Sequence, residues 1–341
     1  MPQIEVRHLS KSFRISERGH GVAGAVKGLF SRTHHTVHAL SDVSFTMEKG
    51  ELVGYIGPNG AGKSTTVKII SGILVPDSGE CRIDGLVPWQ DRVRHVAKIG
   101  VVFGQRTQLW WDLPVAESFD LLRDIYRVSE ADYQRRLGEL VELLDLSPLM
   151  STPVRQLSLG QRMRCDIAAS LIHGPSILFL DEPTIGLDAV AKLAVRDFIR
   201  HINREHEVTV ILTTHDMDDI EYLCNRVLVI GNGRLLSDGS LQDLRERVSG
   251  ERRLIIDLEG APDGVADPQA RVIETEGHRV IFAFDPTVVA TEKLIGRIAA
   301  KHKIRDIFVE NPPIDEIIAT YYTSLAVDEG TPSADEVGGE R

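Results

Sequence analysis

A glycine-rich segment near the start of the chain has the residue types and spacing of a phosphate-binding loop. Residues 57–64 fit the pattern G-x-x-x-x-G-K-[S/T], in which glycines let the backbone wrap closely around phosphates. Lys63 is expected to reach the β- and γ-phosphates of a nucleoside triphosphate, and the Ser64 hydroxyl is expected to bind Mg²⁺. The nucleotide-binding residues predicted here are Gly57, Pro58, Asn59, Gly60, Ala61, Gly62, Lys63, Ser64 and Thr65.

Two adjacent acids follow a short apolar run further along the chain. Asp181 and Glu182 come directly after residues 177–180, and residues just beyond the carboxyl end of a buried strand lie at the ligand edge of a parallel sheet. Asp181 is expected to bind Mg²⁺, directly or through water, and Glu182 to act as general base on the attacking water. His215 follows another apolar run and is expected to contact the γ-phosphate. The alternatives are a solvated pair of acids and a structural histidine, which the phosphate loop upstream disfavours.

These residues need an α/β framework to bring them together. The apolar patterns predict strands that alternate with helices, which is typical of a mainly parallel sheet with helices on its faces. The predicted strands are residues 4–9, taken as an edge strand, 37–47, 51–56, 177–180, 208–213 and 226–230. The predicted helices are residues 63–71, 160–172 and 190–203, with a mostly helical stretch between 88 and 147.

A smaller second domain follows the nucleotide-binding one. The pattern predicts strands near 254–258, 279–284 and 304–309, a helix over 288–300 and another beginning near Pro313. The last residues are rich in Gly, Pro, Ser and acids, which is typical of disorder. We expect boundaries of 1–245 for the main domain, with an insert at about 16–36 and a helical part at about 105–165, then 246–325 for the accessory α+β domain and 326–341 for the tail.

Composition narrows the functional classes. The net charge of −11 argues against a general nucleic-acid binder, whose phosphate contacts need a basic surface. The sequence contains no run of ~20 apolar residues of the kind that spans a membrane, and its first residues do not resemble a signal peptide. The three cysteines are widely spaced and are expected to be reduced thiols. We therefore expect a cytoplasmic chain that reaches a membrane only through partners.

The order of these motifs resembles that of the ABC ATPases. Residues 157–161 read Leu-Ser-Leu-Gly-Gln and are similar to the family signature, usually LSGGQ, and they lie just upstream of the acid pair. Gln105 resembles the Q-loop glutamine, Asp188 ends a segment similar to the D-loop, and His215 matches the switch histidine. The resemblance covers about residues 4–239 and implies a P-loop ABC ATPase domain with a helical subdomain.

The resemblance also implies how the protein works. In the family, two such domains face each other head to tail, and each ATP lies between the phosphate loop of one and the signature of the other. Ser158, Gly160, Gln161 and Asp188 would then contact nucleotide, and Gln105 would serve in catalysis and as a Mg²⁺ ligand. ATP and Mg²⁺ are the implied cofactors. The implied partners are a second copy, or another ABC ATPase subunit, and integral-membrane permease subunits at the cytoplasmic face of the membrane.

The sequence departs from the family pattern in two places. Leu159 replaces the first glycine of the signature, which puts the tightness of the closed state in question. About twenty extra residues follow Phe13, so this aromatic is either the residue that stacks on adenine or a core side chain. The insert is either an amphipathic helix near the membrane or a loop on its own domain, its apolar residues being Val22, Val26, Leu29 and Phe30.

Other features leave the function partly open. Trp110 and Trp111 are either anchors for a permease or core residues. The accessory domain resembles that of type-2 exporter ATPases, and residues 109–113 and 159–164 are similar to the viologen and small-drug kind. An ATPase subunit of an exporter is the favoured function. The alternatives are a soluble ABC ATPase acting on ribosomes or DNA, and a regulator that binds nucleotide without hydrolysing it.

Overall fold

The computed structural model describes residues 2–16, 34–104, 106–248, 250–262, 264–313 and 316–322. The chain separates into two compact units, Met1–Ser240 and Leu241–Arg341. Residues 17–33 of the insert expected at about 16–36, Gln105 and the tail expected at 326–341 lie outside the described residues, so those expectations are not tested.

A mainly parallel sheet forms the centre of the first unit, as the sequence predicts. In spatial order its strands are β5 (Ile99–Phe103), β6 (Ile177–Asp181), β7 (Thr209–Thr213), β3 (Leu52–Ile56), β8 (Arg226–Gly231) and β9 (Arg234–Ser240). All neighbouring pairs are parallel except β8 and β9. The inner strands are almost wholly buried, which explains why they appear in the sequence as continuous apolar runs.

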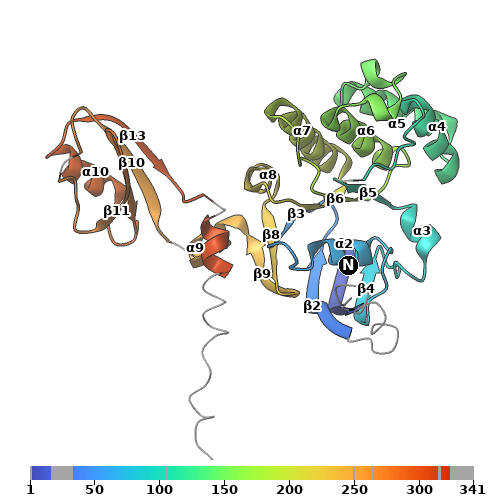
Figure 1. Ribbon diagram of the computed structural model, residues 1–341, viewed down its shortest axis with the longest axis horizontal. Coiled ribbons are helices and arrows are strands. Elements are labelled where there is room, and N and C mark those ends of the chain that lie inside the picture. Colours follow the sequence, from blue (N-terminus) through green and yellow to red (C-terminus); the bar gives the residue numbers. More distant parts are fainter. Residues whose placement is uncertain are drawn as a thin grey trace, which may run out of the picture. The chain divides into compact units, whose positions relative to one another are not determined.

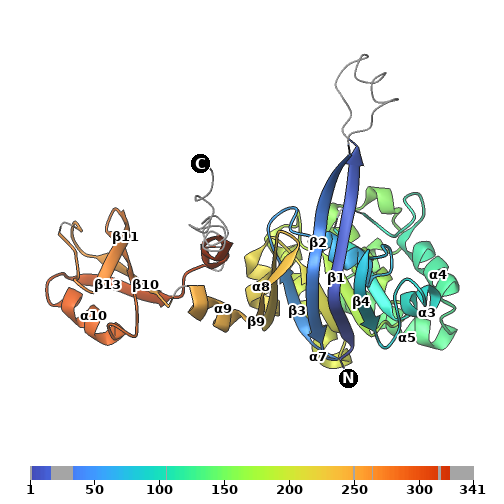
Figure 2. The ribbon, with the colours of Figure 1, turned by 90° about the horizontal axis from the view of Figure 1, so that it is seen from below.

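An antiparallel sheet packs over one face of this parallel sheet. Its order is β2 (His34–Met47), β1 (Ile4–Ser16) and β4 (Ser78–Ile83), and β1 and β2 run side by side as a long ribbon (Figure 2). The prediction that residues 4–9 form an edge strand is wrong, because β1 pairs on both sides. Alternation on β1 arises because one side of its sheet faces the core, where Ile4 and Val6 are buried with Phe179 of β6.

Helix α2 (Lys63–Ile70) lies between the two sheets. Its residues Val67, Ile69 and Ile70 join the same apolar core, and the helix contacts both β2 and β6. The helices of the other face gather on the far side of the parallel sheet (Figure 1). They include α4 (Val115–Tyr126), α5 (Glu130–Leu143), α6 (Leu159–Leu171) and α7 (Ala189–His206). Thus α2 and α6, each of which carries a predicted nucleotide motif, lie on opposite sides of one sheet.

The remaining elements of the first unit are short. They are α3 (Arg92–Val96), η1 (Ser147–Leu149), η2 (Val154–Gln156) and α8 (Met217–Leu223). Strands β4, β5 and β9 are absent from the sequence-based expectations. The stretch between 88 and 147 is therefore not all helical, because β5 is a five-residue apolar segment whose periodicity cannot distinguish a strand from a buried helical turn.

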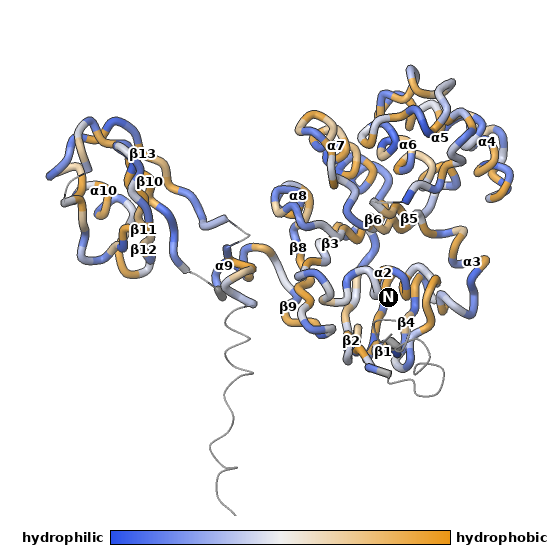
Figure 3. Tube along the Cα trace, viewed as in Figure 1, coloured by the Kyte–Doolittle hydropathy of each residue, from blue (hydrophilic) through white to orange (hydrophobic). Residues whose placement is uncertain are grey.

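The second unit is a four-stranded antiparallel sheet with a helix packed on it. The sheet order is β11 (Ala270–Glu276), β12 (Arg279–Phe284), β10 (Arg252–Leu258) and β13 (Ile304–Glu310). Helix α10 (Thr291–Ala299) packs Leu294 and Ile298 into a core with Ile256 and Phe282. Both apolar and polar residues occur along these elements (Figure 3), and on β10 the buried Leu254, Ile256 and Leu258 alternate with less buried residues, as expected for a sheet with one covered face. Helix α9 (Leu241–Val248) begins this unit, and residues 316–322 are helical near its end.

The described residues include no helix that is both long and apolar enough to span a membrane. Cys81, Cys165 and Cys224 are buried free thiols. Burial raises the pKa of Cys81 and of Cys165 to about 12, so neither sulfur is ionised near neutral pH.

Candidate functional site

The phosphate loop connects β3 to α2 in a backbone conformation that requires glycine. Gly60 and Gly62 have φ values of 80° and 110°, which side chains other than glycine rarely adopt. A Cβ on Gly57 would lie 2.3 Å from the carbonyl oxygen of Ile230, and one on Gly62 would lie 2.6 Å from that of Ala39. One side of the loop therefore packs tightly against β2 and β8. Nothing lies within 4 Å of a Cβ built on Gly60, so the opposite side is open to a ligand.

Lys63 is drawn back over this loop. Its ammonium donates to the carbonyl oxygens of Gly57, at 2.6 Å, and Pro58, at 3.1 Å. Only 7% of the residue is exposed, and this burial lowers the pKa of Lys63, while the nearby Glu182 and Asp181 carboxylates act to raise it. An ammonium held by two neutral carbonyls in a confined space is positioned to bind an anionic phosphate.

The two acids stand at the carboxyl edge of the sheet. Asp181 is the last residue of β6 and accepts a hydrogen bond from the Thr213 hydroxyl, while its carbonyl accepts from the Gly104 amide at 2.7 Å. Glu182 has a left-handed φ of 56°, and its amide donates to the Thr213 carbonyl at 2.8 Å. The chain therefore leaves the extended conformation of β6 at Glu182.

Glu182 also meets the predicted switch histidine. Its Oε1 lies 3.1 Å from Nε2 of His215, which follows β7. The Glu182 side chain is 25% exposed and that of His215 is 44% exposed, so both are reachable from solvent. The pair has the geometry of a carboxylate general base with an imidazole beside it.

Two neighbouring cavities share Glu182. The first, of about 340 Å³, is lined by Ser64, Lys68, Ile73, Phe103, Gly104, Arg106, Asp181 and Glu182. The second, of about 330 Å³, is lined by Glu182, Thr184, Ile185, Gly186, Lys192, Thr214, His215 and Asp216. Ser64, Asp181 and Glu182 thus offer one hydroxyl and two carboxylates to the first cavity. This all-oxygen donor set fits Mg²⁺, a hard cation that is held through one or two carboxylates.

A buried carboxylate fastens the loops behind the site. Asp219 on α8 is fully buried and accepts hydrogen bonds from Thr184, two residues after Glu182, and from Thr214, which precedes His215. The Nε of Arg196, on α7, donates to the same carboxylate at 2.5 Å. Sequence reasoning missed this network, because its members are distant in sequence and no regular spacing marks them.

The signature segment forms the N-terminus of α6, which is fully capped by side chains of the same segment. The Ser158 hydroxyl accepts from the Gln161 amide at 3.2 Å, and the Gln161 side chain accepts from the Ser158 amide at 2.9 Å, forming a capping box. A Cβ on Gly160 would lie 3.6 Å from the Leu187 side chain, and one on Gly186 would lie 2.7 Å from the side chain of Leu159. Within one chain, the signature and the D-loop segment therefore support each other.

Asp188 has a similar capping role at the next helix. Its carboxylate accepts from the Ala191 amide at 2.8 Å and caps α7. The family resemblance assigns Asp188 to nucleotide contact. In this structure the Asp188 carboxylate instead caps a helix of its own chain.

The chain after Gln105 is tied to the signature helix. Asp166 of α6 accepts from the Thr107 hydroxyl at 2.8 Å and from the Gln108 amide at 3.0 Å. Burial raises the pKa of Asp166 to about 6, although these donors act to lower it. These hydrogen bonds hold Thr107 and Gln108 against α6.

The structure thus unites some predicted residues and separates others. Ser64, Asp181 and Glu182 share one cavity, and Glu182 and His215 share the next. Neither cavity is lined by Ser158, Gly160, Gln161 or Asp188. Phe13 is 36% exposed, with the Lys11 ammonium 5.8 Å from its ring centroid, so the alternative that it is a core side chain is wrong. Trp110 and Trp111 are 38% and 50% exposed, which excludes the core alternative for them as well.

The fold and the site together define a P-loop ATPase. A family model described as "ABC transporter" matches residues 40–185. The linearmycin resistance ATP-binding protein LnrL of Bacillus subtilis (strain 168) is 30% identical over 76% of this chain and 84% of its own length. The daunorubicin resistance ATP-binding protein DrrA3 of Streptomyces coeruleorubidus is 31% identical over 82% of this chain and 89% of its own.

A solved structure agrees with these relatives. It is a dimeric ATP-binding cassette in a post-hydrolysis state bound to ADP and Pi, and it matches with a TM-score of 0.59 and 27% identity over 70% of this chain and 98% of that one. The chain therefore belongs to the family of ABC transporter ATP-binding proteins, has the P-loop ABC ATPase fold and is an ATPase. The alternative of a regulator that does not hydrolyse nucleotide is accordingly set aside.

Proposed function

We propose that this chain is the ATPase subunit of an exporter, and that two copies close around two ATP molecules and separate after hydrolysis. The observation that carries the proposal is the division of the site. The phosphate loop, Asp181, Glu182 and His215 gather at one edge of the parallel sheet, whereas Ser158 and Gly160 begin a helix on the other face and line neither cavity there. A second copy would supply the missing signature.

The residues at the sheet edge have separate tasks in this proposal. Lys63 binds the β- and γ-phosphates, exchanging its two carbonyl partners for phosphate oxygens. Glu182 accepts a proton from the attacking water, and His215, 3.1 Å from it, orients the carboxylate and faces the γ-phosphate. Ser64 and Asp181 would hold Mg²⁺, with Gln105 as a further ligand, and the ion would neutralise phosphate charge.

The exporter assignment rests on the relatives and on a surface. LnrL and DrrA3 are named for resistance to linearmycin and daunorubicin, which favours export over the alternative of a soluble ATPase acting on ribosomes or DNA. Trp110 and Trp111 are exposed beside the segment that Asp166 holds against α6, and they are the proposed permease contact. The protein would then work as a peripheral subunit at the cytoplasmic face of the membrane.

Replacing the general base tests the catalytic part of the proposal. Glu182→Gln keeps the side-chain shape but cannot accept the proton, so ATP turnover should fall by roughly 10²–10⁴-fold. Binding of ATP, measured in parallel by fluorescence of a labelled analogue, should remain. Glu221→Gln, which changes an exposed glutamate on α8, serves as the matched control and should hydrolyse ATP at close to the unmodified rate. Turnover near that rate in Glu182→Gln would remove Glu182 from this role.

A further inference from the structure

Three possible metal ligands converge away from the nucleotide site, where α5 meets the end of α7. Glu139 lies on α5, and His201 and His206 lie on α7, whose last residue is His206. One ligand atom from each of the three lies within 4.8 Å of the other two. The three side chains are 36–44% exposed, so an ion could reach them from solvent. No step of ATP binding or hydrolysis proposed above uses them.

The separations between these atoms are close to those of a metal site. Oε1 of Glu139 lies 2.6 Å from Nε2 of His206 and 3.9 Å from Nε2 of His201. A tetrahedral Zn²⁺ with N and O ligands at about 2.0–2.1 Å holds its donor atoms ~3.3 Å apart. The two separations lie on either side of that value. The ligand atoms of the two histidines lie within 4.8 Å of each other, so rotations of these exposed side chains would bring all three atoms to coordination distance.

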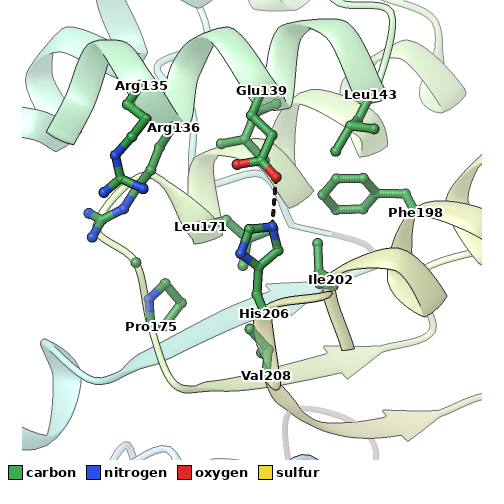
Figure 4. Close-up of a pocket in the computed structure, with 12 residues that line it drawn as sticks. Arg135, Arg136, Glu139, Leu143, Leu171, Pro175, Phe198, Ile202, His206 and Val208 are labelled. Carbon is green, nitrogen blue, oxygen red and sulfur yellow. Dashed lines mark hydrogen bonds and ion pairs between the residues drawn. The ribbon is translucent and has the colours of Figure 1, made fainter. Parts of the chain in front are cut away.

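The surroundings contain charges of both signs. Figure 4 shows Glu139 reaching from α5 to His206 at a pocket of about 250 Å³, with Arg135 and Arg136 on the same helix as Glu139. The Arg135 guanidinium donates to Asp132 at 2.7 Å, and that of Arg136 donates to the Ile172 carbonyl at 3.2 Å. The carbonyl end of α7, at His206, favours a cation. The two guanidiniums oppose this effect, so moderate rather than very tight affinity is expected.

We propose that Glu139, His201 and His206 bind one late first-row divalent cation, of which Zn²⁺ is the representative. Imidazole nitrogens suit Zn²⁺, Ni²⁺ and Cu²⁺, whereas Mg²⁺ prefers oxygen donors alone. Two histidines and a carboxylate leave the fourth position of a tetrahedral ion for water. Because Glu139 comes from one helix and the histidines from another, the ion fastens α5 to the end of α7.

Zinc binding to the full chain tests this proposal. The chelator-treated protein should bind Zn²⁺ in isothermal titration, and His206→Ala and Glu139→Gln should each weaken the binding by about tenfold or more. An excess of Mg²⁺ should not compete. Co²⁺ in place of Zn²⁺ should give the visible absorption of a tetrahedral site, and His206→Ala should abolish it. If His206→Ala folds poorly, His201→Ala provides the same comparison. His201 lies 3.9 Å from Glu139, beyond hydrogen-bond distance, so its removal should disturb the folded chain less.

A control separates this site from other histidines of the chain. His35 and His38 lie on β2, far along the sequence from α7, and their double replacement by Ala should leave Zn²⁺ affinity unchanged. The proposal is wrong if this double variant loses the binding, or if His206→Ala and Glu139→Gln bind Zn²⁺ as well as the unmodified chain. ATPase activity measured with Mg²⁺ is a separate readout, so failure here would leave the proposed function untouched.

Discussion

The phosphate-loop edge and the signature segment are both nucleotide motifs, yet they are built differently. At the phosphate-loop edge, Lys63 begins α2 and lies near Asp181 and Glu182, which stand at the end of β6. At the signature, Ser158 and Gln161 satisfy each other in a capping box, and Leu159 packs on the D-loop of the same chain. Side chains of the first region line a cavity, whereas the second region is the capped N-terminus of α6 on the other face of the sheet.

This difference supports the proposal that the two regions of one chain contact different nucleotides. A converging region can bind phosphate by itself, since its donors already point to one place. The capped start of α6 would contact nucleotide only when a second chain carries the nucleotide to it. The comparison therefore predicts that damage to the first region affects nucleotide binding by a single chain, whereas damage to the second affects only steps that need two chains.

The largest effect should come from the buried network that supports the phosphate-loop edge. Asp219→Asn removes the nearer of the two carboxylates that hold the Arg196 guanidinium and leaves only Asp216, at 3.3 Å, so the free energy of unfolding should fall by about 3 kcal/mol. Thr184 and Thr214 would lose a strong acceptor, which should lower kcat while the KM for ATP changes little. Chemical denaturation and steady-state ATPase assays measure the two effects. Asp218→Asn, exposed on the same helix, is the control, and an equal loss there would contradict the assignment.

The next effect concerns nucleotide binding by one chain. Lys63→Ala removes the ammonium expected on the phosphates, and a hydrogen bond to a charged group contributes roughly 1.5–3 kcal/mol. ATP affinity should therefore fall by roughly 10–100-fold in equilibrium titration. Lys68→Ala, an exposed lysine at the cavity that Ser64, Asp181 and Glu182 line, should have a smaller effect. Unchanged affinity in Lys63→Ala would mean that the phosphate-loop edge does not bind ATP as described.

Acid should destabilise the fold at the C-terminal end of the signature helix α6. Burial lowers the pKa of His173, just after α6, to about 4, so its stabilising contribution is present above pH 6.5 and is lost as the pH falls toward 4. Between pH 7.5 and pH 5 this amounts to about 2 kcal/mol. When the pH falls from 7.5 to 5, the free energy of unfolding of His173→Gln should therefore drop by about 2 kcal/mol less than that of the unmodified chain. Asp166, whose raised pKa acts in the opposite sense, is common to both proteins. Equal losses would show that His173 does not stay neutral.

The smallest effect separates capping from nucleotide contact at the signature. Asn is as good a helix N-cap as Ser, so Ser158→Asn should leave the unfolding free energy nearly unchanged. It would replace the hydroxyl expected on the γ-phosphate of a partner, and ATP turnover should fall about tenfold. ATP affinity of the isolated chain should stay the same. A turnover equal to that of the unmodified chain would show that Ser158 only caps the helix.

The contrast between the two regions also explains what the sequence could predict. The phosphate loop and the acid pair are each made of consecutive residues that follow a single strand, β3 and β6 respectively, so residue types and their order identify them. The contacts of Asp219 span 5, 23 and 35 residues and arise only from packing, so no local pattern reveals them. Phe13 and Trp111 could not be assigned because exposure is a property of the folded chain, and β5 is too short for its periodicity to decide.

The central claim is that two copies of the chain complete each other's sites. It is tested most directly by the molecular mass of Glu182→Gln in solution, measured by light scattering with and without ATP and Mg²⁺. The chain has a mass of 37.8 kDa, and ATP should convert it to a species of about twice that mass, with Ser158→Asn in the same background weakening the conversion. A chain that binds ATP but keeps the mass of one copy at every nucleotide concentration would contradict the account.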